Sequence, residues 1–249
     1  HRLVGDVALE HVQAEVHAGL LARNGRLGRV LEVADVTGSQ EPWGRGDTMF
    51  FMKPQQIAEK QLQEALARHP SIVFAIDYLF WHVYGAGMNE AQRIARFEEG
   101  LARLDRFTSP IVVGDIPDMT HAALLLSKSQ IPRADTLSKV NSRLQAWAHE
   151  RPRVVVIALN ETIAKAINAQ DVQFGGITHT GQQARDLLTF SGLHVTPSGY
   201  IALSLEMLEG LKAKGLIPKN SIWEKDSNVV FKKMIQRKQK STPEKIKPT

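Results

Sequence analysis

Three short runs of consecutive apolar residues stand out along the chain. They fall within Ser71–Ile76, Pro110–Gly114 and Arg153–Leu159, and they show no alternation of polar and apolar side chains. A parallel strand that is buried on both faces gives such a continuous run, whereas a half-exposed strand alternates. We therefore predict three buried parallel strands, with Ser71–Ile76 as the central one. Two further strands are predicted at His1–Gly5 and Arg29–Ala34.

Apolar residues recur at helical spacing between these runs, with polar residues on the opposite faces. Capping patterns also mark the N-termini of several predicted helices. At one of them Asn89 is followed three residues later by Gln92, which is a capping-box pattern. Loops are predicted where breakers or aromatic residues interrupt the periodicity, at 40–53 and Tyr78–Met88, and Ile116–Ala134 is predicted to be a long, partly helical cap. The predicted helices are Ala8–Ala22, Pro54–Arg68, one capped by Asn89, one starting at Asp135, Glu161–Ala169, Gly181–Thr189 and Ser198–Lys214.

The alternation of strands and helices predicts an α/β fold with a parallel sheet of about five strands and helices on both faces. We expect one domain over residues 1–216. Residues 217–249 are expected to be a basic, partly disordered tail, because only brief apolar contacts interrupt their Lys, Gln and Pro content.

The net charge of +5 belongs to this tail. Residues 219–249 carry nine Lys and Arg against three Asp and Glu, so the other 218 residues are close to neutral. A solvated basic tail explains this charge, and nucleic acid is not an expected partner. The absence of cysteine excludes disulfides and a cysteine nucleophile but identifies no compartment.

The chain is expected to be soluble, because it holds no apolar run long enough to span a membrane. It opens on His1 and enters an apolar segment almost at once, which suggests a trimmed N-terminus. A cytoplasmic and an exported location both stay open, and so does the oligomeric state.

Aspartate follows each of the first four predicted strands, and an asparagine follows the fifth. The carboxyl ends of parallel strands share one edge of a sheet, where ligands of α/β proteins bind. Helix capping is the ordinary explanation for any single one of these residues. The residues are Asp6, Asp35, Asp77, Asp115 and Asn160.

The order of these predicted strands, of the residues that follow them and of the segment Ser191–His194 resembles that of the SGNH (GDSL-type) hydrolase family. The resemblance covers nearly the whole chain through Gly215. The four blocks of that family would correspond to Gly5-Asp6-Val7, to Gly38 in a VTGS sequence, to Ala75-Ile76-Asp77-Tyr78, and to Ser191-Gly192-Leu193-His194 before the last helix. The resemblance implies a flavodoxin-like three-layer α/β/α sandwich, and an ester hydrolase whose histidine is His194.

The blocks of this chain depart from the family pattern at three chemical positions. Val7 stands where the family has its nucleophilic serine, and Ser191 replaces the carboxylate that orients the histidine. Asp77 stands where an asparagine donates to the oxyanion, and a carboxylate there would repel developing negative charge. The resemblance implies that His194 keeps the catalytic role of the family and that Gly38 can give a backbone N–H to the oxyanion, with Asp6, Asp77 and Ser191 as the rest of a degenerate site.

Nearby residues offer replacements for the missing groups. Thr37 and Ser39 flank Gly38, so either hydroxyl could be a displaced nucleophile, although capping is the commoner role of such hydroxyls. Tyr78 could line a substrate pocket together with three aromatic neighbours, or all four could be lid or core residues. These neighbours are Trp81, His82 and Tyr84.

Three functions follow from these patterns. The first is hydrolysis of an ester, an acyl ester of a carbohydrate or of a small molecule, without a cofactor or metal. The second is an inactive SGNH-fold protein that binds a ligand or glycan. The third is metal-assisted hydrolysis of a phosphoester by strand-end aspartates.

Overall fold

The computed structural model describes residues 53–123 and 125–226, together with residue 50 and the short pieces 14–16, 44–45, 229–230 and 232–233. Of residues 14–16 and 44–45 the backbone alone is described. The centre of the fold is a parallel sheet of three buried strands, β3 (Val73–Ala75), β4 (Ile111–Gly114) and β5 (Val154–Ile157). β4 lies between the other two, with Val73 paired to Ile111 and Ile111 paired to Val154.

Two short segments extend this sheet beyond β3. β1 (Ala14–Val16) pairs with β3 on one side and with β2 (Gly44–Arg45) on the other, and both pairings are parallel. The strand order is therefore β2-β1-β3-β4-β5.

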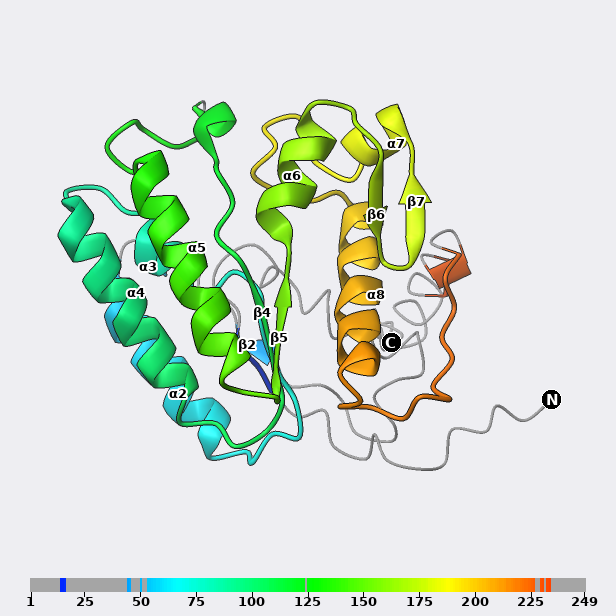
Figure 1. The fold of residues 1–249 in the computed structure, drawn as a ribbon, viewed down its shortest axis with the longest axis horizontal. Coiled ribbons are helices and arrows are strands. Elements are labelled where there is room, and N and C mark those ends of the chain that lie inside the picture. The colour runs from blue at the N-terminus through cyan, green and yellow to red at the C-terminus, as the bar shows by residue number, and fades with distance from the viewer. Residues whose placement is uncertain are drawn as a thin grey trace, which may run out of the picture.

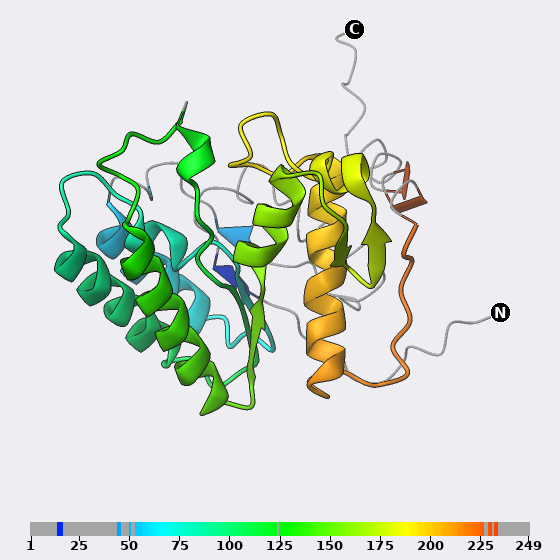
Figure 2. The same cartoon turned by 45° about the horizontal axis from the view of Figure 1, so that its top comes forward.

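Helices cover both faces of the sheet (Figures 1 and 2). On one face lie α2 (Pro54–Leu66), α4 (Glu90–Leu104) and α5 (Ala134–His149), and on the other lies α8 (Pro197–Ala213). The mixed α/β fold predicted from the sequence, with a parallel sheet flanked by helices, is confirmed at this level.

Shorter elements complete the described part of the fold. After β3 comes α3 (Phe80–Val83), after β4 the 3₁₀ turn η1 (Thr120–Ala122), and after β5 helix α6 (Leu159–Ile167). A small antiparallel hairpin beside α8 precedes α7. The hairpin strands and α7 are β6 (Val172–Phe174), β7 (Ile177–His179) and α7 (Gly181–Arg185).

Local sequence signals explain most of the long helices. The predicted capping box at α4 is present, because the Asn89 side chain accepts the Gln92 N–H and the Gln92 side chain accepts the Asn89 N–H, both at 2.9 Å. Proline stands at the start of α2 and of α8, where its missing N–H costs nothing.

The predicted helix Ala8–Ala22 is wrong at its centre, where β1 lies. An amphipathic spacing reports only which local face can be buried, whereas β1 satisfies its backbone by ladders to β3 and β2, which are far away in sequence. The predicted strands His1–Gly5 and Arg29–Ala34 lie outside the described residues.

Three further elements differ from the sequence-based expectation. The predicted loop 40–53 contains β2, and the predicted loop Tyr78–Met88 contains α3. The β6–β7 hairpin was missed although its turn carries Gly175 and Gly176, both at positive φ (66° and 70°). A Gly-Gly pair between two short apolar strands is a hairpin signal, because both positions of such a turn need positive φ.

A buried arginine holds the long excursion after β4 against α3 and α4. Arg93 on α4 is only 2% exposed, and its guanidinium donates to the carbonyls of Val83 (2.5 Å), Ser129 (2.7 Å) and Gln130 (3.0 Å). Glu90 lies 3.3 Å from its Nε. These contacts give the buried Arg93 guanidinium the hydrogen-bond and charge partners without which its burial would be costly.

The segment after α8 packs on the domain for some distance. Ile217, Trp223 and Val230 are buried, and the Lys212 ammonium of α8 lies 5.1 Å from the centre of the Trp223 ring. Buried residues therefore continue past residue 216. No helix in the described part of the chain is both long and apolar enough to cross a membrane.

Candidate functional site at the carboxyl edge of the sheet

Two of the strand-end residues singled out in the sequence meet at the carboxyl edge. Asp115 follows β4 directly, and its Oδ1 accepts the backbone N–H of Asn160 in the first turn of α6 at 2.7 Å. The N-cap residue of α6, Ala158, has no side-chain acceptor. Asp115 therefore caps the start of α6 from a neighbouring strand. Burial raises the pKa of the Asp115 carboxyl, while the N–H groups of Asn160 and Leu159 act in the opposite direction.

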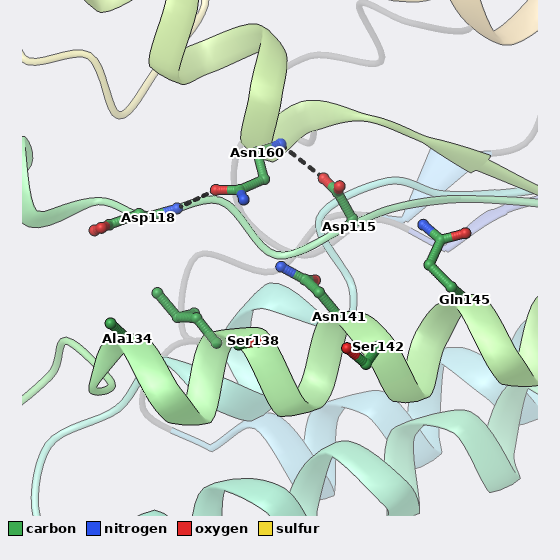
Figure 3. A pocket seen from close by; sticks show the side chains of 9 residues that line it. Asp115, Asp118, Ala134, Ser138, Asn141, Ser142, Gln145 and Asn160 are labelled. Carbon is green, nitrogen blue, oxygen red and sulfur yellow. Dashed lines mark hydrogen bonds between the residues drawn. The ribbon is translucent and has the colours of Figure 1, made fainter.

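The loop after Asp115 is fixed by two asparagine side chains. Asn141 on α5 accepts the Ile116 N–H at 2.7 Å and donates to the Ile116 carbonyl at 2.8 Å. Asn160 accepts the Asp118 N–H at 2.9 Å (Figure 3). The strand-end loop is thus held from both α5 and α6.

A pocket of about 490 Å³ lies between this loop and α5 (Figure 3). Its lining is mainly polar, with Ser138, Ser142 and Gln145 on the α5 side and Asp115, Asp118 and Asn160 on the strand side. Among the described residues that line it there is no Lys, Arg or His.

The loop of residues 189–196, which carries His194, has a fixed backbone and leads into α8. The His194 carbonyl accepts the Thr189 N–H at 2.8 Å and the Thr189 hydroxyl at 3.0 Å, while Leu188 and Val195 form an antiparallel bridge. Arg185 braces the loop further by donating to the carbonyls of Leu188, Thr189 and Phe190. The side chain of His194 is exposed on this rigid loop.

Ser191 bonds within the same loop. Its hydroxyl lies 3.2 Å from the Thr189 hydroxyl and accepts the Leu193 N–H at 3.4 Å. These contacts shape the turn that precedes His194.

A histidine that the sequence analysis did not single out links this loop to the strand-end loop. Gly192 adopts a φ of +71°, and a Cβ at this position would lie 2.5 Å from Nε2 of His121 and 2.5 Å from Cδ1 of Ile167. The His121 ring of η1 therefore packs directly on Gly192, two residues before His194. No motif surrounds His121 in the sequence, so only the fold brings it to this edge.

Asp77 and Tyr78 lie in the turn that follows β3, and both are buried, with exposed fractions of 4% and 1%. Burial raises the pKa of the Tyr78 hydroxyl, and within the described residues this hydroxyl has no hydrogen-bond partner. The neighbouring Trp81, His82 and Tyr84 are buried as well. Core packing is thus the arrangement seen for this aromatic group.

The remaining predicted site residues lie outside the described part of the chain. They are Asp6, Val7, Thr37, Gly38 and Ser39. The strand-end residue Asp35 also lies outside the described part. Their roles stay predictions.

The described residues include no group of three or more His, Cys, Asp or Glu side chains that could hold a metal ion. The metal-assisted alternative therefore gains no support from them. In comparisons with known proteins, the chain matches no protein-family model and no curated protein sequence.

Proposed function

We propose that this chain is an ester hydrolase of the SGNH type with an atypical catalytic set around His194. The observation that carries the proposal is the braced loop that exposes His194 immediately before the long helix α8, the position that the SGNH pattern gives to its histidine. The strand order β2-β1-β3-β4-β5 supports the finer assignment to a flavodoxin-like sandwich, which has this order.

The proposed reaction follows the logic of a serine hydrolase with relocated groups. A hydroxyl of Thr37 or Ser39 attacks the ester carbonyl, and His194 takes the hydroxyl proton and passes it to the departing alcohol. Water then attacks the acyl-enzyme with His194 again as base, the bond from the acyl carbon to the Thr37 or Ser39 oxygen breaks, and His194 returns the proton to that oxygen as the acid leaves. The backbone N–H of Gly38 donates to the oxyanion, since an ionised Asp77 has no proton to donate.

The proposal is tested by hydrolysis of a short-chain aryl ester, p-nitrophenyl acetate, by the full chain. His194→Ala should lower the enzymatic rate by about 10²–10⁴-fold, the usual contribution of a general base. His149→Ala is the matched control, because His149 is an exposed histidine at the end of α5, and it should leave the rate unchanged.

The nucleophile is identified by labelling with a fluorophosphonate and mapping the modified residue by mass spectrometry. A label on Thr37 or Ser39 that is lost in the corresponding alanine variant would support the mechanism. A folded wild-type protein with no turnover above buffer and no label would contradict it and would favour the ligand-binding descendant.

A further inference from the structure

One face of α5 carries an uncharged polar stripe. Ser138, Asn141, Ser142 and Gln145 follow one another at spacings of three, one and three residues, which places them on one side of the helix. Three of the other exposed positions of α5 are charged, namely Asp135, Lys139 and Arg143. The stripe faces the pocket at the carboxyl edge (Figure 3).

Three side chains of the stripe retain their full hydrogen-bonding capacity. Within the described part of the chain, the side chains of Ser138, Ser142 and Gln145 have no hydrogen-bond partner. Asn141, by contrast, uses its amide oxygen and one of its two amide N–H donors on the backbone of Ile116. The stripe thus contains one side chain that is held by the backbone, Asn141, and three whose donors and acceptors can bind a ligand.

The opposite wall of the pocket is also rigid and contributes a donor. Asn160 uses its Oδ1 for the Asp118 N–H, which fixes the orientation of its amide and leaves Nδ2 on the pocket wall. Figure 3 shows the Asp115 carboxylate turned toward the start of α6, and the Asp118 carboxylate pointing away from Asp115. The two carboxylates therefore do not converge on one point in the pocket.

This chemistry excludes several ligand classes. Among the described lining residues, an anion would meet two carboxylates and no cationic side chain, and a cation would lack converging carboxylates. An apolar ligand would find only Ala134 and Leu137 among polar groups. A neutral molecule with many hydroxyl groups can use hydroxyl and amide side chains both as donors and as acceptors.

We propose that this pocket binds a neutral, hydroxyl-rich small molecule, of which a sugar is the simplest representative. Its volume lies in the range of small-molecule sites, about 300–1,000 Å³. His194 is not among the described residues that line this pocket. Binding there does not require ester hydrolysis, so the two proposals can fail separately.

The test is a titration of the ¹⁵N-labelled full chain with methyl β-D-glucopyranoside, N-acetyl-D-glucosamine and maltose, followed by NMR. At least one sugar should shift the backbone amide signals of residues 138–145 and the side-chain amide signals of Gln145 and Asn160. Putrescine and inorganic phosphate serve as the cationic and anionic probes and should leave these signals in place.

Variants connect the shifts to the pocket. Gln145→Ala combined with Ser142→Ala should weaken binding of the responding sugar by about tenfold or more, the effect of losing one or two hydrogen bonds. Lys139→Ala, on α5 but outside the pocket, should leave the affinity unchanged. Absence of any sugar response, a response to putrescine or phosphate instead, or shifts confined to another surface would each overturn the proposal.

Discussion

His82 is a neutral histidine at the centre of the helix layer, and its burial couples stability to pH. The side chain is completely buried, and its Nδ1 lies 2.9 Å from the Tyr78 carbonyl, so that this nitrogen carries the proton and donates it. In the described part of the chain Nε2 has no hydrogen-bond partner. Burial lowers the pKa of His82 to about 4, because a charged imidazole would lose its hydration there.

The sign of the pH effect follows from proton uptake on unfolding. The unfolded chain binds a proton on this histidine below about pH 6.5, whereas the folded chain does so only near pH 4. The contribution of neutral His82 to the free energy of unfolding is therefore fully present above pH 6.5. It is lost as the pH falls from 6.5 to 4.

We expect His82→Leu to reduce the acid-induced loss of stability. Between pH 7.5 and pH 4.5 the wild-type free energy of unfolding should fall by roughly 2–3 kcal/mol more than that of the variant. Urea unfolding at the two pH values measures this difference, and the exposed His149→Ala is the control that should behave as wild type. Equal pH dependence in wild type and His82→Leu would show that His82 also titrates normally when folded.

At the scale of elements, contacts between segments far apart in sequence fix the carboxyl edge. The cap of α6 comes from Asp115, and the turn before α8 is complementary to His121 because Gly192 has no side chain. Loops of this kind keep functional groups in place when a rigid scaffold supports them.

Removing the cap of α6 should destabilise the protein measurably. Asp115→Ala deletes the acceptor of the Asn160 N–H, so the free energy of unfolding should fall by about 0.5–2 kcal/mol. Asp115→Asn should recover most of this loss, because an amide oxygen also accepts the bond. Urea unfolding gives the stability, and hydrogen exchange of the Asn160 amide should be faster in the alanine variant.

Asp186→Ala is the control for this comparison. Its carboxylate accepts an exposed side-chain bond from Gln182, so its removal should change stability by no more than about 0.5 kcal/mol. A loss in Asp115→Ala no larger than in this control would mean that the cap contributes nothing.

At the scale of the whole molecule, two truncations that differ in the buried part of the segment after α8 should differ in stability. Removing everything after Lys233 should keep the melting temperature within a few degrees, because Ile217, Trp223 and Val230 remain. Removing everything after Leu216 deletes all three buried side chains. Each contributes about 1.5–3 kcal/mol when fully buried, so the melting temperature should fall by about 10 °C or more.

Calorimetry of the two truncated chains and the full chain measures these effects. Trp223→Ala in the full chain provides an intermediate case that leaves the backbone intact, and its melting temperature should lie between those of the two truncations. A melting temperature that drops strongly after truncation at Lys233 would show that the basic end of the chain also stabilises the domain.

Much of the fold was predictable because its signals are local. Continuous apolar runs identified β3, β4 and β5, since strands buried on both faces must be apolar throughout. The capping box at Asn89 and the proline at the start of α8 marked helix starts, since capping depends on residues within one turn.

The site was predictable only in part. The spacing of the strands placed Asp115 and Asn160 at one edge, which is confirmed by their hydrogen bond. The sequence also pointed to His194, because this residue stands in the loop before the last long helix. The roles of Asp77, Ser191 and the residues near Gly38 stay predictions.

Only the tertiary structure decided how distant segments meet. Three contacts join segments that are far apart in sequence: the pairing of β1 with β3, the packing of His121 on Gly192, and the position of the α5 stripe opposite Asn160. A local pattern reports which face of a segment is apolar or polar, but not which partner covers that face. The sequence therefore determined the three central strands, the long helices and several of their ends, and the packing of those elements decided which polar groups became a cap, a brace or a pocket wall.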